Sequence, residues 1–137
     1  MSNFIDGIMQ AIADYIDTEV EPYASIVFGS DPPDSGICMI QGSSAPTDTH
    51  LDKGMIYRIP VVLNGKNKNQ AVLLEDLTAI HVALTRKTDY SGLSTADCQI
   101  VDIATTAAPS IIGREQNSQW ICGSSFEVTI YWSREED

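Results

Sequence analysis

The first stretch of the chain carries its apolar side chains at intervals of three and four residues. These side chains are Phe4, Ile5, Ile8, Met9, Ile12, Tyr15 and Ile16. The spacing predicts an amphipathic helix over residues 3–18 with one apolar face. Residues 70–86 share this period, with Leu73, Leu77, Ile80 and Leu84 on one face, and predict a second helix.

Alternation of apolar and other side chains predicts strands in the rest of the chain. It is clearest in the closing run 119–132, where Phe126, Val128, Ile130 and Trp132 face one way. Further strands are expected at 24–28, 37–41, 55–64, 98–106 and 110–112. Pro60 lacks the backbone donor and predicts an edge strand or a bulge. Gly123 predicts a bulge in the last strand.

Turn-forming residues separate these segments. Asp31-Pro32-Pro33-Asp34 predicts a rigid corner that feeds strand 37–41, because proline fixes its own φ and restricts the residue before it. Residues 42–54 are polar and predict a loop. Asn64-Gly65 predicts a turn, whose tip Lys66 and Lys68 would make basic.

This order of elements predicts an α+β fold, in which a mostly antiparallel or mixed β-sheet packs against two helices. The 137 residues suit a single domain, residues 1–137. A domain of this length can bury a hydrophobic core without a disulfide or a structural metal to stabilise it. The cysteines Cys38, Cys98 and Cys122 lie in apolar runs without metal-ligand spacing. We therefore expect buried, reduced thiols.

The charge of the chain is unevenly distributed. Residues 1–52 hold nine acidic and no basic residues, 53–87 hold six basic and two acidic, and 88–137 hold eight acidic and two basic. This order either gives faces of opposite sign, suited to head-to-tail association, or is mixed by folding. The net charge of −11 argues against nucleic-acid binding.

No targeting or membrane segment is visible in the sequence. The apolar N-terminal stretch is interrupted by aspartates and lacks the basic start of a signal peptide. No run reaches the roughly 18 apolar residues of a membrane span. We expect a protein that binds no membrane and stays in a cytoplasm until it is used.

Candidate chemistry is sparse. Asp48, His50 and Asp52 form a D-x-H-x-D pattern that could ligate a metal, although a polar loop holds such residues by chance. Asp31 and Asp34 could act as paired carboxylates, but aspartate before proline is ordinary in turns. His81 lies beside an apolar helix face and suits a partly buried structural histidine. With no phosphate-binding or nucleophile motif, the sequence predicts no catalytic residue, no metal and no cofactor.

Two segments together resemble a known family. The first, Ala107 to Trp132, places Pro109, Ile112-Gly113 and Arg114-Glu115 before a hairpin and an amphipathic final strand. The second is the N-terminal helix that runs through a Pro-containing turn into a short strand. Together they are similar to the minor capsid or tail-terminator proteins of long-tailed bacteriophages and prophages. This chain departs from the family in having Gln-Asn-Ser after Glu115, where a tighter Gly-containing turn is usual.

The resemblance implies a non-enzymatic virion protein of the tail or neck, made in the cytoplasm of a bacterial host. Such proteins form a ring, typically a homohexamer, that caps the tail tube and presents a surface to the head connector. The partners would be further copies of the chain, the tail-tube protein and the head–tail connector protein. Candidate contact residues are Lys66, Lys68, Asp31, Asp34, Arg114 and Glu115. The alternatives are a head-side connector or stopper protein, and a small ligand-binding or enzymatic domain.

Overall fold

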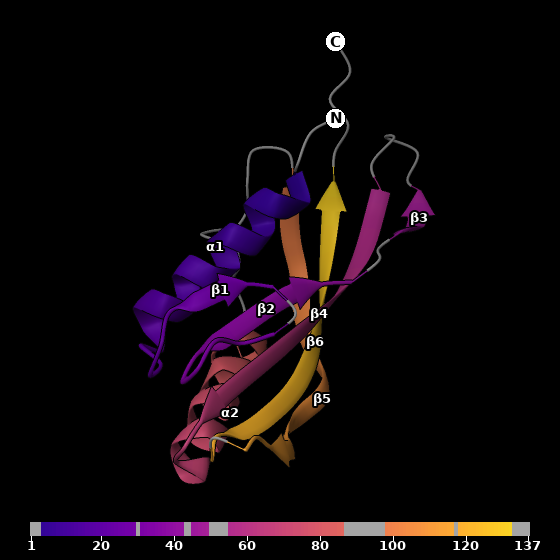
Figure 1. Cartoon of the computed structure of the whole chain (residues 1–137). Helices are drawn as coiled ribbons and strands as arrows, with labels where there is room; N and C mark the ends of the chain where they lie inside the picture. The colour runs from indigo at the N-terminus through magenta and orange to yellow at the C-terminus, as the bar shows by residue number, and fades with distance from the viewer. Residues whose placement is uncertain are drawn as a thin grey trace.

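The computed structural model describes residues 4–29, 31–42, 45–49, 55–86, 98–116 and 118–132. In these ranges two helices and six strands form one α+β unit, which confirms the predicted fold class (Figure 1). The elements are α1 (Phe4–Glu19), β1 (Ile26–Phe28), β2 (Ile37–Gln41), β3 (Ala45–Thr49), β4 (Met55–Asn67), α2 (Gln70–Thr85), β5 (Cys98–Arg114) and β6 (Trp120–Trp132).

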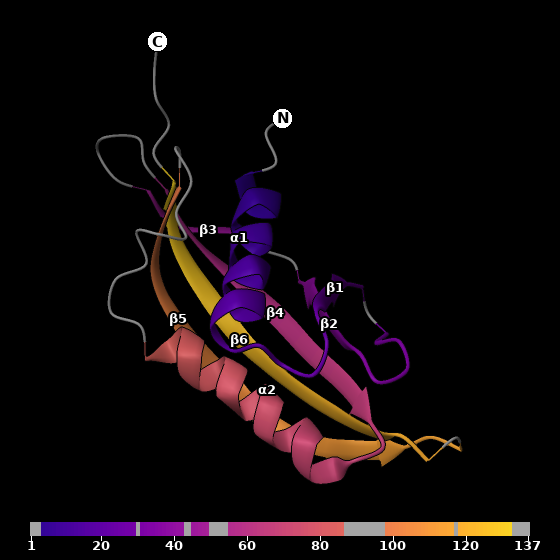
Figure 2. The same cartoon turned by 90° about the vertical axis from the view of Figure 1, so that its left-hand side faces the viewer.

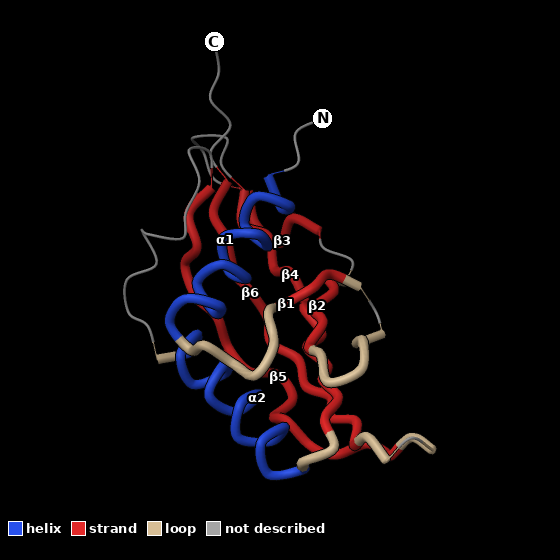
Figure 3. The backbone as a smooth tube through the Cα atoms, turned by 60° about the vertical axis from the view of Figure 1, so that its left-hand side comes forward, coloured by secondary structure: helices blue, strands red, loops and turns tan. Residues whose placement is uncertain are grey.

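The six strands form one mixed sheet in the order β1-β2-β4-β6-β5, with β3 pairing β4 as well. The short β1 is parallel to β2, and the remaining pairs are antiparallel. Both helices lie against the same face of this sheet (Figure 2), and the strands curve behind them (Figure 3). The face without helices is called the open face below.

The core lies between the helices and the sheet. Alternation along β4 shows how the sequence builds it, since Ile59, Val61 and Leu63 are fully buried whereas the residues between them are exposed. The fully buried side chains of the helices are Ile8, Ile12, Ile16, Leu73, Leu77, Ile80 and Leu84. Both predicted apolar helix faces therefore form the core. Helix α2 begins after Asn69, whose side chain accepts hydrogen bonds from the backbone N–H groups of Ala71 and Val72.

The predicted turn at Asn64-Gly65 is wrong. Strand β4 continues through these residues to Asn67 and pairs with β6 along its whole length. A Cβ atom at Gly65 would lie 2.9 Å from the Tyr23 hydroxyl and 3.0 Å from Cδ1 of Leu73. The glycine is needed for this close approach of side chains to the strand, and not for a change of chain direction.

Pro60 does not mark an edge strand, because β4 has β2 and β3 on one side and β6 on the other. The carbonyl of Pro60 accepts a hydrogen bond from the Gly42 N–H at 2.6 Å. In an extended strand the nitrogen of a residue points to the same side as its carbonyl. The missing donor of Pro60 therefore faces the junction where β2 has ended and β3 begins.

The C-terminal half also differs from the prediction. Residues 98–114 form one strand, whereas two were expected at 98–106 and 110–112. The four register shifts between β5 and β6 each place an extra residue on β5, while β6 stays in continuous register with β4. The bulge predicted at Gly123 is therefore wrong. Strand β3 lies within 42–54, which was predicted to be a loop.

Candidate interaction site

The corner formed by Asp31 to Gly36 has the rigid turn that its prolines predict. The Gly36 N–H donates to the carbonyl of Pro33 at 2.9 Å, and Ser35 adopts a φ of 51°. A Cβ atom at Gly36 would clash with the ring of Pro33. The prediction of a corner that feeds β2 is confirmed.

Three contacts fasten this corner to the sheet. The Ser35 N–H donates to Oε1 of Gln119 at 2.6 Å, and the Lys66 N–H donates to the carbonyl of Gly36 at 2.9 Å. The Tyr23 hydroxyl lies 2.9 Å from the Gly36 carbonyl and 2.8 Å from that of Lys66. Burial raises the pKa of Tyr23 well above its ordinary value, with a smaller contribution from Asp76. Tyr23 therefore acts here as a hydrogen-bond donor.

Lys66 lies beneath the corner with its side chain only 7% exposed. Its Nζ is 2.7 Å from Oε2 of Glu115 and 3.6 Å from Oδ1 of Asp31. The hydrogen bond to Glu115 is the main cause of its raised pKa. The predicted basic tip at Lys66 is therefore wrong, because this cation is buried in a strand and paired within its own chain. Folding here brings a cation of the basic segment 53–87 next to a carboxylate from each of the acidic segments 1–52 and 88–137.

The other candidate contact residues are exposed. Asp34 lies in the corner and Lys68 just before α2. The guanidinium of Arg114 stacks over the Trp120 ring, with its Cζ atom 4.9 Å from the ring centroid. The structure thus brings Asp31, Lys66 and Glu115 together and leaves Asp34, Lys68 and Arg114 at the surface.

His81 is 4% exposed, in accordance with the predicted structural role. Its Nδ1 lies 2.9 Å from the Thr105 hydroxyl and its Nε2 2.9 Å from the Ser124 hydroxyl. Ser124 donates its own hydrogen to the carbonyl of Leu63, so it accepts from His81. Nε2 therefore carries a proton, and burial lowers the pKa of His81, which favours the neutral imidazole.

The remaining candidates for chemistry are either outside the described residues or buried. His50, Asp52 and the side chain of Asp48 lie outside the described residues, as does the side chain of Cys98. Cys38 and Cys122 are buried free thiols, and burial raises the pKa of Cys122 to about 11. In the described ranges no His, Cys, Asp and Glu residues cluster as metal ligands. No described helix is long and apolar enough to span a membrane.

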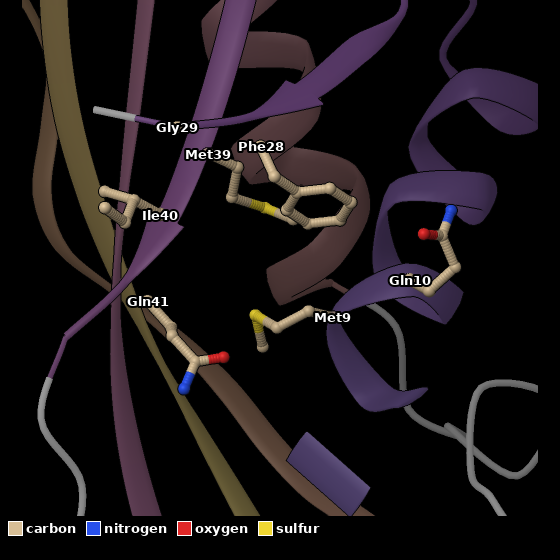
Figure 4. A pocket seen from close by; sticks show the side chains of 7 residues that line it. All are labelled: Met9, Gln10, Phe28, Gly29, Met39, Ile40 and Gln41. Atoms are coloured by element: carbon tan, nitrogen blue, oxygen red, sulfur yellow. The ribbon is translucent and has the colours of Figure 1, made fainter. Parts of the chain in front are cut away.

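An apolar groove of about 430 Å³ lies between α1 and the β1–β2 edge. It is lined by Met9, Gln10, Phe28, Gly29, Met39, Ile40 and Gln41. The side chains of Met9, Phe28 and Met39 converge in it (Figure 4). Phe28 remains 50% exposed, which is unusual for a ring next to the core. The sequence pattern does not reveal this groove, because each of its apolar residues fits an ordinary helix or strand position.

The open face carries exposed apolar side chains as well. They are Val27, Ile40, Val62 and Ile112, the last of which is 65% exposed. Ile112 lies beside Gly123, where a Cβ atom would be 3.3 Å from its Cδ1. All four side chains are at least 39% exposed. Apolar surface therefore lies in the groove and on the open face, which share Ile40, and in a further hollow on α2 lined by Leu74, Glu75, Thr78, Ala79 and Val82.

No family model matches the chain, and no curated protein sequence is significantly similar to it.

Proposed function

We propose that the protein is a tail terminator of a long-tailed bacteriophage or prophage. In this role several copies form a ring, with six as the expected number, that caps the tail tube and presents a surface to the head connector. The protein then acts through contacts and not through catalysis.

The observation that carries the proposal is the exposed apolar surface of the groove and the open face. Phe28 is 50% exposed in the groove and Ile112 is 65% exposed on the open face. A ring is built from heterologous contacts, in which a patch on one copy meets a different patch on the next. The apolar surface around Phe28 and that around Ile112 supply the two halves of such a contact.

Charge adds to this argument. A ring at the end of the tail tube surrounds the path of DNA, and a net charge of −11 would keep the DNA from adhering to its lumen. Lys68, Asp34 and Arg114 are exposed and remain the charged candidates for contacts with another protein. Lys66 instead pairs within its own chain, at 2.7 Å with Glu115 at the β5–β6 end and at 3.6 Å with Asp31 in the corner.

Deletion of the gene from a phage or prophage that carries it tests the proposal. Negative-stain microscopy should show full heads beside separate tails of irregular or excessive length, and the intact gene supplied in trans should restore joined particles. Normal tails beside heads that lose DNA would instead assign the protein to the head side, as a connector or stopper. Unaltered particles would contradict any role in the neck.

A further inference from the structure

We infer that the end of the β5–β6 hairpin of one copy docks into the groove of a second copy of this chain. The docking segment, residues 110–116, is called the tip below. The inference rests on the proposed ring and names the contact that would build it. The side chain placed in the groove is Ile112, and the charge that guides it is Arg114.

The groove is suited to an incoming aliphatic side chain. Its volume of about 430 Å³ exceeds that of an isoleucine side chain, and Met9, Phe28 and Met39 line it. Methionine side chains are flexible and adapt to the shape of a bound group. Phe28 offers an aromatic surface that is half exposed in the single chain and would be covered in the complex.

The tip presents the matching group. Ile112 is the most exposed of the large apolar side chains in the described part of the chain, at 65%. Glu115 donates its N–H to the carbonyl of Gln119 at 2.8 Å and accepts from the Ser118 N–H at 3.0 Å, which holds the turn beyond it. The salt bridge between Glu115 and Lys66 holds the base of the tip in place. An ordered tip loses little conformational entropy on docking.

The two surfaces are complementary in charge. On the rim of the groove, Gln10 donates a hydrogen bond to Oδ1 of the exposed Asp14 at 3.1 Å. Residues 1–52, which form α1 and the β1–β2 edge, carry no basic residue. Arg114 lies two residues from Ile112, is exposed, and has no ion pair within the described ranges. Ile112 in the groove would bring this guanidinium toward the acidic rim.

The contact requires a second copy. The tip lies at the end of the sheet where β4 leads into α2 (Figures 1 and 2). The groove is lined by residues of α1, β1 and β2, and strands β4 and β6 separate β2 from β5 in the sheet. A tip therefore cannot enter the groove of its own chain without unfolding the sheet. Repetition of one tip-to-groove contact uses both patches of every copy, as a closed ring does.

Disulfide trapping tests the contact directly. In a Cys98→Ser background, Gln10→Cys on the groove and Ser110→Cys on the tip, which keep Phe28 and Ile112 in place, are made singly and together, and Val82→Cys replaces Gln10→Cys as a control. Like Gln10, Val82 is an exposed helix position, but it lies on α2. We expect the two single variants to form a disulfide dimer only when mixed, and the double variant to form a ladder of multimers. A mixture that forms no dimer, or no more than the Val82→Cys control mixture, would overturn the inference.

A charge exchange gives an independent readout. Arg114→Glu should lower the mixed-disulfide yield severalfold, and Asp14→Arg on the Gln10→Cys partner should restore it. Both positions are exposed, so the circular dichroism spectra of these variants should match that of the parent. An unchanged yield in Arg114→Glu would remove the proposed role of the charge pair.

The outcomes separate this contact from the proposed function. If gene deletion gives the tail-terminator phenotype but no mixed dimer forms, the ring stands and uses another contact. If the mixed dimer forms while deletion leaves the particles unaltered, the chain self-associates but is not a tail terminator.

Discussion

Nζ of Lys66 lies 2.7 Å from Oε2 of Glu115, which joins the end of β4 to the turn that follows β5. Oδ1 of Asp31, in the corner that precedes β2, lies 3.6 Å from the same ammonium. Lys66 thus orders the base of the tip that we infer to dock into a neighbouring copy. Its burial makes it a structural cation.

Replacement of Lys66 by methionine should therefore destabilise the protein. The substitution keeps most of the buried stem but leaves the half-buried Glu115 without its charged donor. We expect a loss of about 1–3 kcal/mol in the free energy of unfolding, measured by urea denaturation. Lys68→Met is the matched control, because Lys68 is exposed, and it should change stability by less than about 0.5 kcal/mol. Equal effects of the two substitutions would contradict the structural role of Lys66.

Replacement of both Asp31 and Asp34 by asparagine should leave the fold intact. The side chain of Asp31 is 83% exposed and 3.6 Å from Lys66, so its ion pair is screened by water. We expect a loss of no more than about 1 kcal/mol in the urea experiment. A loss of several kcal/mol would show that the corner depends on these carboxylates and not on its prolines and Gly36.

His81 should make stability depend on pH. Burial lowers its pKa in the folded protein below the ordinary 6.5, so the unfolded chain binds the proton more readily. The stability that neutral His81 contributes is present above about pH 6.5 and is lost as the pH falls from there toward the folded-state pKa. No ionisable group is among its hydrogen-bond partners, Thr105 and Ser124.

The His81→Gln variant isolates this effect. Its unfolding free energy should change less than that of the parent over the pH range just below 6.5, even though the substitution lowers stability at neutral pH. Parallel pH profiles for parent and variant would mean that His81 keeps its ordinary pKa in the folded protein.

Gly65→Ala should destabilise the protein, because the new methyl group would lie 2.9 Å from the Tyr23 hydroxyl and 3.2 Å from Cδ1 of Leu77. We expect a loss of about 1–3 kcal/mol from this overpacking. Gly113→Ala is the control, since nothing lies within 4 Å of a Cβ atom there. Thermal unfolding should show a lower midpoint for Gly65→Ala alone, and a parent-like midpoint would refute the close approach.

Ser118→Gly should stabilise the hairpin turn. Ser118 has a φ of 72°, a left-handed conformation that costs a non-glycine residue about 1–2 kcal/mol. Its side chain is exposed, so little packing is lost. Glycine has more conformational freedom in the unfolded chain, which offsets part of this stabilisation. We therefore expect the free energy of unfolding, measured by urea denaturation, to rise by about 0.5 kcal/mol. A destabilised Ser118→Gly would indicate that the serine side chain itself supports the turn.

The helices and the core could be predicted from the sequence, because a period of three and four residues is a local property. The first helix was expected at 3–18 and lies at Phe4–Glu19, and the second was expected at 70–86 and lies at Gln70–Thr85. Strand β2 matches its predicted range. Strand β3 escaped prediction because its polar sequence, APTDT, gains its order by pairing with β4.

The errors arose where contacts between distant segments override local signals. Asn64-Gly65 has the composition of a turn, but pairing of β4 with β6 keeps it extended. Lys66 looked like a surface cation, because its partners Asp31 and Glu115 come from two other parts of the chain. The groove combines residues of α1, β1 and β2. The periodicity of apolar residues in the sequence does not indicate which of these segments lie next to one another.

Cryo-electron microscopy of the neck of intact particles would test the central claim most directly. We predict a closed ring of copies of this chain at the head-proximal end of the tail tube, with the tip of each copy in the groove of the next. Density for the protein between the portal and the head-side connector, or its absence from the neck, would contradict the claim that it terminates the tail.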